Sequence, residues 1–206
     1  VGDMHQTVRG FGASDCWSIQ YVGTWPATKV NAIADLLFST ELGADGQPRG
    51  IGLSQWRMNL GAGSARRAFI RDPWRRADFF YNDALTGYDW SRCAGQRRFL
   101  QLAKARGVRQ FTAFCNSPPF TMTQNGYTFC DPDVGSTNLA PDKVDAFAGY
   151  LAEVLAHFKT EGIEFSAISP INEPEWDWNG SFRRGRVRAS QEGCRYDNAD
   201  IKAVVS

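Results

Sequence analysis

The sequence contains no apolar run of about 18 residues, the length that a bilayer-spanning helix needs, so no membrane partner is predicted. It also lacks a surplus of charge of either sign. Its 23 Lys and Arg oppose 22 Asp and Glu, which leaves a net charge of +1. This balance gives no overall electrostatic field to attract nucleic acid, and none is predicted as a partner.

Patterns that bind metals or nucleotide cofactors are missing as well. His5 and His157 are far apart, and no Cys-x-x-Cys pair occurs, which excludes zinc-type spacing. The stretch "GFGASD" has Asp15 where a dinucleotide-binding loop needs its third glycine, "GAGSAR" fails in the same way at Arg66, and there is no P-loop. We therefore predict no metal and no cofactor. One or two disulfides can form, with at least one thiol left over, among Cys16, Cys93, Cys115, Cys130 and Cys194.

The chain does contain a regular alternation of strand and helix patterns. At 206 residues and 43% hydrophobic composition it can bury the core of one domain. Apolar runs rich in β-branched and aromatic residues predict strands at 51–60, 108–115 and 163–171, with a weaker one at 6–14. Apolar residues at steps of three and four predict helices at 28–38, 95–106 and 141–160, and a last helix from Asp200.

This alternation predicts an α/β fold with a parallel sheet covered by helices. An open doubly wound sheet and a (β/α)8 TIM barrel both fit. The barrel is favoured because long loops rich in aromatic and polar residues follow every strand, which is where a barrel builds its site. About four βα units are present, so residues 1–206 are predicted to form part of a barrel domain.

Polar and aromatic residues gather at the predicted carboxyl ends of these strands. Asp15 and Trp17 follow the first strand, and period-two alternation places Arg57 and Asn59 on one face of the second. The loop "CNSPPFTMTQNG" follows the third strand, and "NEPEWDW" follows the fourth. Each residue alone has a plainer interpretation: a tryptophan is commonly core, an Asp often caps a turn, and a loop Glu is usually solvated. Their convergence at one end of the sheet favours a binding site.

The stretch "SPINEPEWDW" (169–178) indicates which chemistry such a site performs. Cleavage of a glycosidic bond needs a carboxylic acid that protonates the departing oxygen and a second carboxylate on the opposite face of the sugar. Glu173 supplies a candidate acid, Asn172 an amide for a sugar hydroxyl, and Pro174 a rigid turn. Trp176 offers a flat face for the apolar side of a sugar ring. The sequence therefore predicts a carbohydrate substrate.

Five motifs in order, "GFGASDCWS", "WRMNLGAG", "NSPPFTMTQNG", "SPINEPEWDW" and "QEGCRY", resemble the signatures of glycoside hydrolase family 30. Within that family they most resemble the endo-β-1,6-galactanase-like branch, over nearly the whole chain. The resemblance implies a (β/α)8 barrel fused to a small β-sandwich, a retaining mechanism and Glu173 as the acid/base. It also implies an extracellular or periplasmic protein whose signal peptide is not in this chain. The substrate-binding residues that follow are Asp15, Trp17, Arg57, Asn59, Asn116, Asn172, Trp176 and Tyr196, with Arg57 orienting the nucleophile.

The chain departs from the family pattern in three ways. Asn116 stands where many members have tryptophan, which predicts a different subsite. The nucleophile, a glutamate after the seventh strand in the family, is expected beyond Ser206. The segment "NGSFRRGRVRAS" carries Arg183, Arg184, Arg186 and Arg188, which fit a loop that meets acidic sugars, a solvated insertion or a sequence error. A non-catalytic, carbohydrate-binding fragment without the nucleophile is the alternative to an enzyme.

Overall fold

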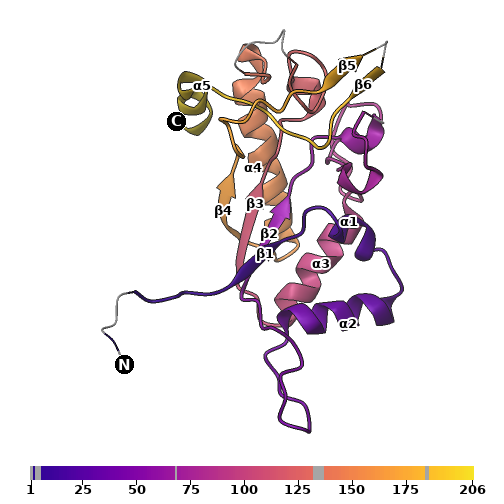
Figure 1. Cartoon of the computed structure of the whole chain (residues 1–206), viewed down its shortest axis with the longest axis vertical. Coiled ribbons are helices and arrows are strands. Elements are labelled where there is room, and N and C mark those ends of the chain that lie inside the picture. The colour runs from indigo at the N-terminus through magenta and orange to yellow at the C-terminus, as the bar shows by residue number, and fades with distance from the viewer. Residues whose placement is uncertain (1, 3–5, 68, 132–136, 184–185) are drawn as a thin grey trace.

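The structure, a computed structural model, describes residues 2, 6–67, 69–131, 137–183 and 186–206. Four parallel strands form its central sheet (Figure 1). They are β1 (Gly12–Ser14), β2 (Gln55–Asn59), β3 (Gln110–Phe114) and β4 (Phe165–Ser169). All four strand predictions are confirmed, although the first strand is much shorter than the pattern suggested.

The strand order separates the two architectures that the sequence left open. Each strand pairs with the next in the chain, in the order β1-β2-β3-β4. A doubly wound sheet reverses its strand order at a switch point, whereas a barrel adds each strand beside the previous one. The sheet is therefore the first part of a (β/α) barrel, as predicted. One irregularity lies between Phe111 and Thr112, where the register of β3 against β4 shifts.

Helices follow the strands as expected. The main ones are α2 (Ala27–Phe38), α3 (Ala94–Ala105), α4 (Val144–Thr160) and α5 (Asn198–Val205), and a short α1 (Ile19–Val22) precedes them. The last helix begins before Asp200 because the Asp197 carboxylate accepts hydrogen bonds from the backbone N–H groups of Ala199 and Asp200. Single turns of 3-10 helix lie at Ser64–Arg66, Pro73–Arg75, Phe120–Met122 and Pro141–Lys143.

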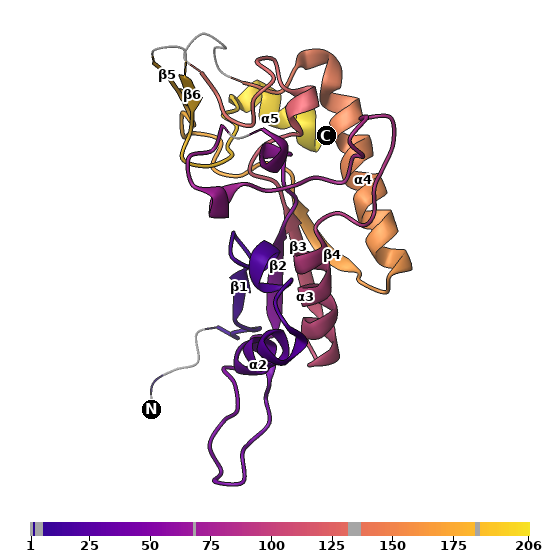
Figure 2. The same cartoon turned by 90° about the vertical axis from the view of Figure 1, so that its right-hand side faces the viewer.

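The core lies between the helices and one face of the sheet (Figure 2). Trp56 and Met58 of β2 point toward the helices and are buried. The Trp56 ring lies 5.1 Å from that of Phe38 on α2 and 5.7 Å from that of Phe99 on α3. The α4 helix packs on β4 through Phe158. Alternation along β2 was predicted, and it fixes which side chains remain on the opposite face.

That opposite face carries polar groups and is not covered by a helix. Gln55, Arg57 and Thr112 lie on it and line a hollow of about 370 Å³. In a closed barrel this face points to the interior, where side chains from successive strands meet. The strands β1 and β4 are the two edges of the sheet. The position of Arg57 on this face brings it toward the carboxyl ends of the neighbouring strands.

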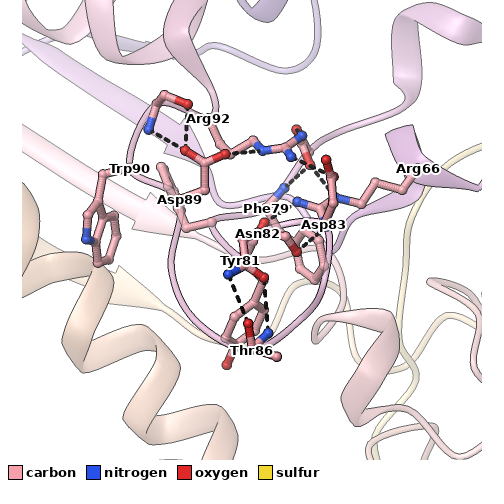
Figure 3. A network of polar contacts seen from close by, with 12 residues as sticks. Arg66, Phe79, Tyr81, Asn82, Asp83, Thr86, Asp89, Trp90 and Arg92 are labelled. Carbon is pink, nitrogen blue, oxygen red and sulfur yellow. Dashed lines mark hydrogen bonds and ion pairs between the residues drawn. The ribbon is translucent and has the colours of Figure 1, made fainter.

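The long connection from β2 to α3 is held by arginines and aspartates (Figure 3). The Arg92 guanidinium contacts three carboxylates, of Asp78 at 3.2 Å, Asp83 at 2.6 Å and Asp89 at 2.9 Å. Arg66 also contacts Asp78, at 3.3 Å. Because Asp78 lies between the two arginines, the network joins the start of this connection to its end.

A hairpin that the sequence patterns did not predict, β5 (Ser181–Arg183) and β6 (Arg186–Arg188), stands above the carboxyl ends of the sheet strands (Figure 1). It contains the arginine-rich segment. Arg184 lies outside the described residues, and the Arg188 side chain is exposed. The hairpin continues into Ala189, which pairs with Ile70 in the connection after β2. This pairing ties the end of the hairpin to the connection after β2.

Candidate functional site

A row of polar side chains crosses the carboxyl ends of β2, β3 and β4. The Arg57 Nη2 donates a hydrogen bond to Asn172 Oδ1 at 2.9 Å, and Asn172 Nδ2 donates to Asn116 Oδ1 at 3.1 Å. Asn116 Nδ2 in turn donates to Asn59 Oδ1 at 3.3 Å. Four predicted site residues are therefore brought into direct contact, although they come from three strands far apart in the sequence.

The position of Arg57 is fixed from a second direction. Its guanidinium carbon lies 3.4 Å from the centre of the Phe114 ring, at the end of β3. A guanidinium stacked on an aromatic ring keeps its planar edge free for hydrogen bonds. Arg57 can thus hold Asn172 in the plane of the sheet while its charge remains at the site.

Asp15 is buried and is joined to the row through Asn59. Its carboxylate accepts hydrogen bonds from the backbone N–H of Asn59 and from Gln96 Nε2, both at 2.8 Å. Gln96 also donates to the Asn59 carbonyl at 2.9 Å. Burial raises the pKa of Asp15 to about 7, and the bonds from Gln96 and Asn59 oppose only part of that rise. The predicted contact of Asp15 with a sugar hydroxyl stays a prediction, because both oxygens are engaged by the protein.

Gln96 had not been recognised as part of the site. It lies on α3, three residues before Phe99 on the same buried face. A polar residue in line with apolar ones on a helix face was the available signal, since such a group needs a buried partner. That partner is Asp15, 81 positions away in the chain.

Glu173 follows β4 in an unusual backbone conformation. Its φ is +48°, in the left-handed region, and its side chain is exposed. Its carbonyl accepts hydrogen bonds from the backbone N–H of Trp176 at 3.2 Å and from Trp178 Nε1 at 2.9 Å. Glu173, Pro174, Glu175 and Trp176 line a cavity of about 600 Å³, within the range of ligand sites. The predicted acid Glu173 therefore faces open space, next in the chain to Asn172 of the polar row.

The predicted aromatic contacts differ in accessibility. Trp176 is 68% exposed, so its ring is available to a ligand. Trp17 is half-buried, and the Arg75 guanidinium carbon lies 4.7 Å from its ring centre. Tyr196 is only 4% exposed, which does not fit the direct sugar contact expected of it. Its backbone N–H donates to the Pro174 carbonyl at 3.1 Å, so Tyr196 supports the turn that carries Glu173.

Tyr196 ends a segment, 191–196 ("QEGCRY"), that joins the loops after β2, β3 and β4. Glu192 is fully buried and accepts hydrogen bonds from the backbone N–H groups of Ala62 at 3.0 Å and Ser64 at 3.1 Å. Burial raises its pKa to about 7. Further hydrogen bonds join the segment to the three loops. Gln191 accepts one from Arg75 after β2, and the Arg195 guanidinium donates one to Asp177 after β4. After β3, the Gly193 N–H donates to the Thr128 carbonyl and the Arg195 N–H to the Cys130 sulfur. The motif had been noted in the sequence, but Glu192 had not been assigned a role.

The described residues contain no cluster of three or more His, Cys, Asp or Glu side chains suited to a metal ion. All five cysteines are free thiols. Within the ranges that the structure covers, no helix has both the length and the apolar character needed to cross a membrane.

Comparison with known proteins identifies related chains. The family model described as O-Glycosyl hydrolase family 30 matches residues 1–206. An endo-beta-1,6-galactanase from Hypocrea rufa is 29% identical over 216 residues, which cover 97% of this chain and 42% of the relative. A solved structure of a conserved exported protein from Bacteroides fragilis matches with a TM-score of 0.86 and 35% identity, over 97% of this chain and 40% of that one.

A more distant structure supports the fold alone. The catalytic domain of GH30 xylanase C from Talaromyces cellulolyticus matches with a TM-score of 0.64 and 23% identity, over 94% of this chain and 40% of that one. The chain therefore spans about two fifths of the length of the relatives that it matches.

Proposed function

We propose that this chain, which belongs to O-glycosyl hydrolase family 30, forms the part of a retaining β-glycosidase site that carries the general acid/base, Glu173. The observation that carries the proposal is the position of Glu173. It stands at the carboxyl end of β4, next to the Asn172 row, and lines an open cavity of about 600 Å³. Barrel enzymes build their sites at this end of the strands.

In the proposed mechanism Glu173 acts twice. It first protonates the departing glycosidic oxygen, and its carboxylate then takes a proton from the water that hydrolyses the glycosyl-enzyme intermediate. A retaining mechanism needs a second carboxylate about 5–5.5 Å from the first. We place that nucleophile beyond Ser206, in barrel units that the chain does not include, together with a β-sandwich domain. Arg57, on the polar face of the sheet, would orient that nucleophile.

The other site residues would hold the sugar. Trp176 offers an exposed ring for stacking. Asn59 and Asn116 are buried, so they would hold the partly exposed Asn172, whose amide group would contact a sugar hydroxyl. We propose a β-linked polysaccharide or oligosaccharide as substrate, with β-1,6-galactan favoured by the endo-beta-1,6-galactanase relative. The similarity to an exported protein supports a secreted location.

The test is the Glu173→Gln variant of a protein that carries residues 1–206 together with the remaining barrel units. We expect turnover of an unactivated β-glycoside to fall by ~10²-fold or more, the usual worth of general acid catalysis. The loss should be much smaller for a dinitrophenyl glycoside, whose leaving group needs no proton. Glu175→Gln is the matched control, because Glu175 is exposed and lines the same cavity. Equal loss on both substrates would show that Glu173 is not the acid.

A further inference from the structure

We infer that Trp178 and Gly193 act together as positioning residues for Glu173, an inference that rests on the proposed function. Neither residue needs to touch the substrate for this role. Both support the short turn 173–178 through contacts that reach the loop after β3.

The turn needs such support because two of its residues have strained backbones. Glu173 has a φ of +48° and Trp178 a φ of +51°. The left-handed conformation is unfavourable for a residue that has a Cβ, so it persists only where surrounding contacts hold it. At Glu173, the backbone conformation also sets the direction in which the carboxyl group leaves the chain.

Trp178 supplies the contact that closes the turn. Its indole Nε1 donates to the Glu173 carbonyl at 2.9 Å, across five residues. Its own carbonyl accepts a hydrogen bond from the backbone N–H of Cys130 at 3.0 Å. The residue thus joins Glu173 at one end to the loop after β3 at the other. A rotation of the indole would release the Glu173 carbonyl from one of its two donors.

Gly193 keeps the indole in place by its lack of a side chain. A Cβ on Gly193 would lie 2.2 Å from Trp178 Cδ2 and 2.4 Å from Cε3, distances that no packed carbon atoms adopt. Gly193 does not have a positive φ, so the requirement is for space and not for backbone freedom. Its N–H donates to the Thr128 carbonyl at 2.9 Å, which prevents the glycine from moving aside.

A positioning role and a merely structural role affect different reactions. If Trp178 positions Glu173, its loss should slow reactions that need the proton and spare those that do not. A merely structural role would slow both kinds of reaction to the same degree. The ratio of the two rates therefore reports on the position of the acid, independently of how much folded protein is present.

The experiment uses a protein that contains this chain and the remaining barrel units. Trp178→Phe keeps an aromatic ring beside Gly193 and removes the indole N–H donor. We expect kcat on an unactivated β-glycoside to fall about ten-fold, as for the loss of one hydrogen bond, with KM little changed. The rate on a dinitrophenyl glycoside should fall less than two-fold. Gly193→Ala should shift the ratio in the same direction, because the added methyl group displaces the indole.

Gly149→Ala is the control for the glycine variant, since nothing lies within 4 Å of a Cβ added there. Glu173→Gln serves as the reference for complete loss of the acid. Suppose that Glu173→Gln slows the unactivated glycoside more than the dinitrophenyl glycoside, but that Trp178→Phe keeps the wild-type ratio of the two rates. The positioning role is then wrong and the proposed function stands. If Glu173→Gln slows both substrates equally, the proposed function fails. Should Gly193→Ala not fold, Trp178→Phe alone decides.

Discussion

At the scale of single residues, Asp15 and Glu192 are two carboxyl groups sealed inside the protein. Burial raises the pKa of each to about 7. In the unfolded chain, Asp15 would lose its proton near its usual value of 3.8. Between these two pH values the folded state therefore holds protons that the unfolded state has released. Stability must fall as the pH rises through that window, because deprotonation favours the unfolded chain.

We predict that the free energy of unfolding decreases from about pH 4 to pH 7, and that Asp15→Asn makes this decrease smaller. An Asn at this position cannot ionise, so one of the two contributing groups is removed. Urea denaturation at a series of pH values, on a protein that carries residues 1–206 and the remaining barrel units, measures the effect. Asp45→Asn, an exposed aspartate, should leave the slope unchanged. A slope that is identical in the wild type and Asp15→Asn would contradict the buried, proton-holding state of Asp15.

At the scale of elements, the connection between β2 and α3 depends on Arg92, which faces three aspartates. We predict that Arg92→Ala lowers the free energy of unfolding by about 1–3 kcal/mol, because the partly buried Asp78 loses a charged hydrogen bond. Arg49→Ala is the matched control. The Arg49 side chain is 59% exposed and pairs with Glu41 at 3.5 Å, so its loss should change stability by less than about 0.5 kcal/mol. Equal effects of the two substitutions would refute a special role for the network.

The main elements could be predicted because each carries its own periodic pattern. The buried residues of α4 include Phe147, Leu151, Val154 and Phe158, and these steps of three and four are visible in the sequence. The sequence does not predict the β5–β6 hairpin because its short strands have no apolar alternation, and its arginines fit a loop that meets acidic sugars, a solvated insertion or a sequence error equally. The pairing of Ala189, directly after β6, with the distant Ile70 is not visible in any local pattern.

The candidate site could be predicted in part for a similar reason. Residues at strand ends, such as Asn116 and Asn172, were found because parallel strands bring their carboxyl ends together. Glu192 could not be found in this way. Its two donors, Ala62 and Ser64, lie 130 and 128 positions earlier in the chain, and no local pattern distinguishes a buried glutamate from a solvated one. The burial of Tyr196 likewise depends on packing that the sequence does not display.

At the scale of the whole molecule, the sheet ends in two unpaired edges, β1 and β4. Open edges invite pairing with another chain, and the polar face of the sheet is without the rest of a barrel. We predict that residues 1–206 expressed alone dimerise or aggregate and hydrolyse no β-glycoside, while a chain with the remaining units is an active monomer. Light scattering after size-exclusion chromatography and an activity assay test this. A monomeric, active 1–206 whose activity is abolished by Glu173→Gln would overturn the placement of the nucleophile outside this chain.

The row from Arg57 to Asn59 has a direction as well as a position. A guanidinium has donors but no acceptor, so Asn172 must turn its oxygen toward Arg57 and its amino group toward Asn116. The same constraint passes to Asn116 and then to Asn59, which receives a hydrogen bond on its oxygen. The Asn59 amino group is consequently directed away from the row as a donor. A single cation at one end thereby sets the orientation of every amide dipole in the row, including that of Asn172, the one of the three asparagines that is not buried.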